Sequence, residues 1–127
     1  MSRYTLHIPC WRPALINELL RSVKDRIRRK KHDRSVVWAY AYQAKIPPAR
    51  GRRRVSLHVT LGRGMKRFDE DAWQKSGLDA LKHAKLIVDD TTAGVEIGSL
   101  TFDRNPTDWG SVISLEDLSR EENGHEF

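Results

Sequence analysis

The sequence has few of the features that mark secreted or membrane proteins. It contains one cysteine, Cys10, which excludes a disulfide bond within the chain. No apolar run approaches the length of about 20 residues that a membrane span needs, and the first residues lack the apolar block of a signal peptide. We therefore expect a soluble, cytoplasmic protein. We expect no zinc site, because His7 and Cys10 form an isolated H-x-x-C pair without a second pair at zinc spacing.

The length and the charge distribution are more informative. A chain of 127 residues can bury one core but is short for two domains of ordinary size. The net charge of +6 is uneven: residues 21–54 hold 13 Lys and Arg against two acids, whereas residues 102–127 hold seven acids against two arginines. We expect one domain over residues 1–118, followed by a disordered acidic tail over residues 119–127.

The spacing of apolar residues predicts a small α+β domain. Alternation predicts strands over residues 4–8, 55–61, 95–102 and 111–116. Three- and four-residue spacing predicts helices over residues 14–27, 36–44 and from about Asp71 to Ala84. The basic run at residues 26–31 either prolongs the first helix or breaks it near His32 and Asp33. This order of elements suits a small mixed β-sheet with helices packed on it.

Acidic residues gather around the third predicted helix. Asp69 and Asp71 stand at its start, and Lys75 would share a helical face with Asp71 because the two are four residues apart. The apolar run at residues 86–88, read as a short strand or turn, could deliver Asp90 beside the first two acids. Three converging carboxylates suit Mg²⁺, which prefers oxygen ligands and keeps several waters.

A purely structural interpretation of the same residues stays open. Acids at a helix start cap free amide groups and offset the helix dipole, and Asp89 and Asp90 could belong to an ordinary turn. Lys75 could form only a surface ion pair with Asp71, which would contribute about 0.3 to 0.5 kcal/mol. Taken separately, these motifs favour this interpretation.

The joint pattern points elsewhere. R-x-D-x-D-x-x-Q-K, then L-D-A-L and D-D, occupies residues 67–90 and resembles the RusA family of Holliday-junction resolvases. The resemblance implies that Asp69, Asp71 and Asp90 hold metal and are catalytic, with Lys75 as the catalytic-site lysine. The asparagine that usually follows the second aspartate in that family is Ala72 here.

The resemblance also implies an activity. Members of the family are metal-dependent endodeoxyribonucleases, hydrolases of DNA recombination and repair that resolve four-way junctions by paired strand nicks. It implies Mg²⁺ as the cofactor, with Mn²⁺ able to substitute, branched DNA as the partner, and a homodimer that presents one site to each of two strands. Lys75 would contact the scissile phosphate or position the attacking water.

Positive charge near the acids would be needed to bind DNA phosphates. We predict DNA contacts from two basic segments, the first within a mobile arginine-rich loop at residues 47–54 and the second directly before the acids: Arg52, Arg53, Arg54, Arg63, Lys66 and Arg67. Phe68 and Trp11 are either stacking residues at an opened junction or core residues. The main rival function is a basic nucleic-acid-binding protein of the same fold without catalytic activity, which Ala72 favours. A nuclease for RNA or flap DNA is a third possibility.

Overall fold

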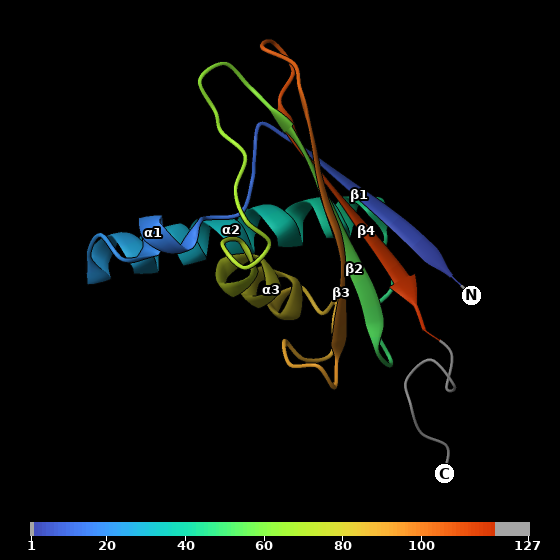
Figure 1. Ribbon diagram of the computed structural model, residues 1–127. Coiled ribbons are helices and arrows are strands. Elements are labelled where there is room, and N and C mark those ends of the chain that lie inside the picture. Colours follow the sequence, from blue (N-terminus) through green and yellow to red (C-terminus); the bar gives the residue numbers. More distant parts are fainter. Residues whose placement is uncertain (1, 119–127) are drawn as a thin grey trace.

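The computed structural model describes residues 2–118, and the tail at 119–127 lies outside the described residues. A four-stranded mixed sheet has helices on one of its faces (Figure 1), which confirms the predicted α+β class. The strands and helices, in chain order, are β1 (Arg3–Pro9), α1 (Ile16–Leu19), α2 (Val23–Ala44), β2 (Arg53–Leu61), α3 (Gln74–His83), β3 (Val95–Arg104) and β4 (Gly110–Asp117).

The strand order β1-β4-β2-β3 differs from the chain order. Strand β3 pairs in parallel with β2, and α3 lies on the connection between them. The chain then returns past β2, so that β4 lies between β1 and β2 and is antiparallel to both. Strands β3 and β4 are neighbours in sequence but not in the sheet, an arrangement that apolar spacing does not reveal.

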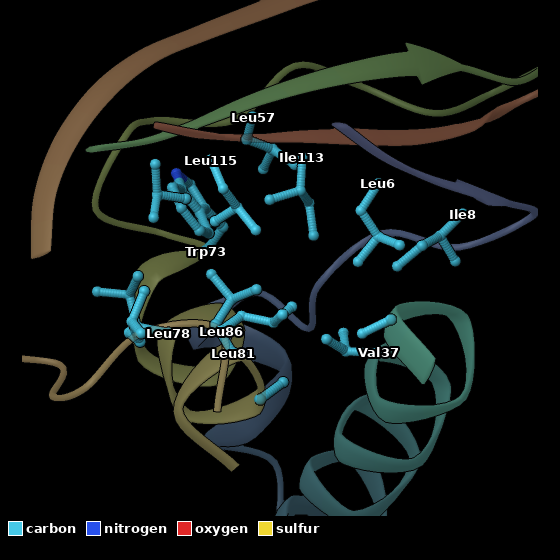
Figure 2. Packing of buried hydrophobic residues seen from close by; sticks show 14 of the residues in the cluster. Leu6, Ile8, Val37, Leu57, Trp73, Leu78, Leu81, Leu86, Ile113 and Leu115 are labelled. Carbon is cyan, nitrogen blue, oxygen red and sulfur yellow. The ribbon is translucent and has the colours of Figure 1, made fainter. Parts of the chain in front are cut away.

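The core lies between the sheet and the helices (Figure 2). Alternate residues of β2 are buried, as the strand pattern predicts, and they meet Leu6 of β1, Leu115 of β4, and Leu78 and Leu81 of α3. Each such side chain contributes about 1.5 to 3 kcal/mol when it leaves water. Trp11 is 4% exposed and belongs to this core.

The first helices differ from the prediction. The predicted helix over residues 14–27 is interrupted at residues 20–22, and α2 then runs without a break through the basic segment and past His32. The cause is Ser22, whose Oγ accepts a hydrogen bond from the Asp25 amide at 3.0 Å and caps the new helix. At the other end, Lys45 adopts a left-handed conformation with φ of 57°, two residues before Pro47.

Asp33 lies inside α2 and does not break it. Its side chain is 1% exposed and accepts hydrogen bonds from Trp11 Nε1 at 3.0 Å, the Ala14 amide at 2.9 Å and Ser76 Oγ at 2.5 Å. One carboxylate therefore joins the segment between β1 and α1, α2 itself, and α3. Asp33 is four residues before the buried Val37, so the two share one side of α2. An acid at a helical position where burial is expected is the sequence signal for a buried, hydrogen-bonded carboxylate of this kind.

Candidate functional site

The turn that carries Asp69 and Asp71 precedes α3. The helix begins at Gln74, with Trp73 at its N-cap, so Asp71 lies three residues before the first helical residue. The expectation that Asp71 and Lys75 share a helical face is therefore wrong. All three charged side chains, those of Asp69, Asp71 and Lys75, are exposed, and none forms an ion pair within residues 2–118.

Backbone hydrogen bonds hold this turn in place. The Ala72 amide donates to the Asp69 carbonyl at 3.1 Å, and the Ile16 amide donates to the Ala72 carbonyl at 2.8 Å. Trp73, the next residue, is 2% exposed in the core. The two aspartates thus project from a turn that is anchored on both sides, to α1 and to the core.

The second acidic segment follows α3. Residues 86–88 form a bend and not a strand, and Leu86 and Ile87 are buried at 1% and 2% exposure. Asp89 accepts hydrogen bonds from the Asp90 amide and from Thr91 Oγ1, both at 2.8 Å. The Thr91 hydroxyl and then this amide lower the pKa of Asp89. Asp89 therefore closes the turn, while the exposed Asp90 side chain is left without an ion pair among residues 2–118.

Helix α3 separates the two acidic turns. Lys82 Nζ lies 3.7 Å from Asp89 Oδ1, which locates the second turn at the C-terminal end of α3, whereas Asp71 precedes its N-terminus. A helix of ten residues is about 15 Å long. Within residues 2–118 no three His, Cys, Asp or Glu side chains are arranged to hold a metal ion. Asp69 and Asp71 share a turn, and Asp90 does not join them in this chain.

The carboxylates of Asp69, Asp71 and Asp90 are suitable ligands for Mg²⁺, but the structure does not bring all three together. Exposed carboxylates without a counter-ion are the oxygen ligands that Mg²⁺ uses. Their separation means that the free chain holds no complete three-carboxylate site within residues 2–118. Asp79, the acid in the middle of α3, is engaged elsewhere, because Arg34 binds it through two hydrogen bonds of 2.8 and 3.1 Å.

A groove of about 710 Å³ lies beside Asp69. It runs between α1 and residues 64–69, and its charged lining consists of Arg12, Glu18, Arg21, Lys66, Arg67 and Asp69. Arg12 and Glu18 neutralise each other through two hydrogen bonds of 2.9 and 3.0 Å, and the Arg12 guanidinium lowers the pKa of Glu18 to about 2. Lys66 and Arg67 remain exposed, so the groove has a positive rim next to a carboxylate.

Phe68 lines this groove, and its ring packs against another aromatic ring. Its ring meets Phe102 edge to face at a centroid distance of 5.0 Å, and the Arg67 guanidinium lies 5.7 Å from the Phe102 centroid. Phe68 is half-buried. Phe68 and Trp11 were predicted to be either stacking residues or core residues, and the contacts of both side chains are those of packing.

The earlier arginine segment is structural. Arg53 is 2% exposed and donates to Asp117 Oδ1 at 2.6 Å, to the Leu86 carbonyl at 3.0 Å and to the Pro47 carbonyl at 3.1 Å. Its guanidinium also lies 5.0 Å from the Tyr4 ring centroid. The expectation that Arg53 contacts DNA is therefore wrong, because no surface is left for a phosphate. Its bond to Leu86 instead anchors the segment that leads to Asp90.

The neighbours of Arg53 are also occupied. Arg54 Nε donates to Glu96 at 2.6 Å and its Nη1 donates to Glu116 at 2.8 Å, and these carboxylates, Glu96 first, raise the pKa of Arg54. Arg52 Nε donates to the Thr92 carbonyl at 2.9 Å, and its Nη1 lies 3.5 Å from Glu96. Arg53 and Arg54 also belong to β2, so the predicted mobile loop ends before them.

No family model matches the chain, and no curated protein matches it. No helix among residues 2–118 is long and apolar enough to cross a membrane. The likeness to junction resolvases therefore depends on the motif at residues 67–90.

Proposed function

We propose that the protein is a Mg²⁺-dependent endodeoxyribonuclease that resolves four-way DNA junctions by paired nicks, acting as a homodimer in the cytoplasm. The observation that carries the proposal is the exposure of the motif residues and their lack of ion pairs within residues 2–118. Asp69, Asp71, Lys75 and Asp90 are all exposed and without ion pairs in the described chain, and Asp69 lines a groove with a positive rim. Acids that cap a helix start accept hydrogen bonds from its first amides, and α3 has no such side-chain cap bond.

The charged residues have separable roles in this proposal. Lys66 and Arg67 bind backbone phosphates along the groove. Lys75, in the first turn of α3, directs its positive charge at the scissile phosphate, where negative charge develops during cleavage. Mg²⁺, when bound, supplies a metal-bound hydroxide and neutralises charge on the phosphate.

The proposal requires one rearrangement. Because α3 separates the acidic turns, the segment with Asp90 must approach the turn with Asp69 and Asp71 when the cation and DNA bind. Neither acid-bearing segment is helix or strand, but the movement must release contacts that hold the Asp90 segment: the turn bonds of Asp89 and the hydrogen bond from Arg53 to the Leu86 carbonyl. A conformational step of this kind is common when substrate binding completes a catalytic site.

The test compares two neighbouring acids on a labelled four-way junction with Mg²⁺. We expect Asp71→Asn to lower the cutting rate at least about a hundredfold while junction binding stays within about threefold, since a lost ligand removes metal-assisted catalysis. Glu70→Gln is the matched control, because Glu70 is an equally exposed acid one residue away, and it should cut normally. Equal cutting by both variants would contradict the proposal.

The alternative is a protein that binds nucleic acid without cutting it. Two observations favour it: Ala72 replaces the asparagine usual in the resembling family, and no three-carboxylate group is assembled within residues 2–118. Gel electrophoresis of the labelled junction after incubation with the protein and Mg²⁺ separates the two functions, because a retarded junction with no cut product supports the binding protein. A panel that adds RNA and flap DNA identifies a nuclease with a different substrate.

A further inference from the structure

One outer face of α2 carries an ordered set of side chains. They are exposed and recur at alternating spacings of four and three residues, which brings them onto one side of the helix: Lys24, Arg28, Lys31, Ser35, Trp38 and Tyr42. We call this set the α2 stripe. The buried residues Val37 and Ala41 face the core instead. The stripe contributes nothing to the groove beside Asp69.

The aromatic end of the α2 stripe is open to solvent. Trp38 and Tyr42 stack with a centroid distance of 5.3 Å and an interplanar angle of 14°, yet they are 52% and 72% exposed. Large aromatic rings contribute most when they are buried. A stacked pair that is exposed to this extent on a helix offers a surface on which a further flat ring can stack.

The other end of the α2 stripe is cationic. Lys24 and Lys31 form no ion pair within residues 2–118, and Arg28 meets Asp25 only at 3.8 Å with 68% of its side chain exposed. A second copy that met this face in the same direction would bring like charges together, which disfavours that form of self-association. A polyanion has the complementary charge, and the aromatic pair selects a polyanion that also carries flat rings.

We propose that the α2 stripe binds single-stranded nucleic acid, with phosphates on Lys24, Arg28 and Lys31 and bases stacked on Trp38 and Tyr42. The span from Lys24 to Tyr42 is about 27 Å along the helix, which suits the smaller single-strand sites of about 4 to 16 nucleotides. Paired bases expose no ring faces except at an end, so duplex DNA satisfies only the charges. The inference needs neither metal nor cleavage, and it therefore goes beyond the proposed nuclease.

The test measures the binding of a fluorescein-labelled 12-nucleotide oligothymidylate in EDTA. We expect the double variant Trp38→Ala and Tyr42→Ala to bind at least about tenfold more weakly, since each stacked base is a large part of the affinity. Binding of a duplex of the same length should change less than about threefold. Leu20→Ala is the control, because Leu20 is 73% exposed and lies outside the stripe, and its affinity should equal that of the parent.

Two further readouts report the chemistry of the contact. Trp11 and Trp73 are buried and Trp109 is half-buried beside Gly62, so the quenching of tryptophan fluorescence by the oligonucleotide should fall most in Trp38→Phe. Lys31→Gln should reduce the slope of log affinity against log salt by about 0.7. Circular dichroism of each variant should match the parent, because the substituted side chains are exposed.

Several results would overturn the inference. These are equal oligonucleotide binding by the parent and the double aromatic variant, unchanged fluorescence, or a parent dimer that the aromatic variant converts to monomer. The junction-cutting assay keeps the two proposals apart. A protein that binds oligothymidylate through Trp38 but never cuts a junction contradicts only the nuclease, and one that cuts but does not bind contradicts only the α2 stripe.

Discussion

The two basic segments at the start of β2 and just beyond its end have similar composition but opposite environments. Arg52, Arg53 and Arg54 are bound to carboxylates and carbonyls on neighbouring segments, whereas Arg63 and Lys66 are exposed and form no ion pair among residues 2–118. The difference follows from the sheet. The first segment enters β2, where β3 and β4 place Glu96, Glu116 and Asp117 alongside it, while the second lies in the loop beyond β2.

Arg54 also belongs to a row of charged residues that crosses the sheet. Cross-strand pairing aligns Arg3 with Glu116, Glu116 with Arg54, and Arg54 with Glu96, so that charges alternate in sign across four strands. Opposite charges directly across a strand pair stabilise a sheet. Arg54 is bound by a carboxylate on each side within this row, whereas Arg63 and Lys66, in the loop beyond β2, are exposed.

The largest effect should come from Arg53. Replacing it by Met leaves the Asp117 carboxylate and two carbonyls without their donor, and we expect the free energy of unfolding to fall by about 3 kcal/mol. Urea denaturation measures this loss. Arg63→Met is the matched control and should change stability by less than about 0.5 kcal/mol. Equal losses in the two variants would remove the distinction between the segments.

The second effect concerns DNA. Changing Arg63, Lys66 and Arg67 together to Gln should weaken junction binding and reduce the slope of log affinity against log salt by up to about 2.7, or about 0.9 for each phosphate that these side chains neutralise. Stability should be nearly unchanged because these side chains are exposed. Arg54→Gln tests the other segment and should leave the salt slope as it is. A slope that responds to Arg54 and not to the triple variant would reverse the assignment.

The smallest effect is a dependence of stability on pH. The folded-state pKa of Glu18 is about 2, lowered first by its hydrogen bonds with Arg12, against an ordinary value of 4.5. This contribution is complete above about pH 4.5 and is lost as the pH falls toward 2. We expect about 1 kcal/mol, because the carboxylate is 20% exposed and water screens the pair.

Denaturation of the parent and of Glu18→Gln between about pH 6 and pH 2.5 measures this contribution. The difference in stability between the two proteins should shrink as the pH falls. A difference that stays constant over this range would contradict the ion pair with Arg12.

Local spacing predicted the elements better than their arrangement. The four strands and α3 follow from alternation and from helical spacing because those patterns reflect burial of one face. The position of β4 between β1 and β2 does not, since it depends on a connection that passes over β2. The break before α2 was missed because apolar residues continue across it, although Ser22 followed by Asp25 is a recognisable helix start.

The candidate site was predictable in part for the same reason. Sequence spacing placed Asp71 at the start of a helix that in fact begins at Gln74, and it could not show that Asp90 lies at the far end of that helix. The partners of Arg53 also come from three separate segments, so its burial could not be read from an arginine-rich run. Contacts between distant parts of the chain decide which charges are structural.

The central claim is that the two acidic turns at the ends of α3 form one cation site on DNA. The most direct measurement is anomalous scattering from Mn²⁺ in crystals of the protein with a four-way junction. We predict a Mn²⁺ peak within ligand distance of Asp71 and Asp90 together. A structure in which DNA is bound while these carboxylates remain at opposite ends of α3, with no shared ion, would contradict the claim.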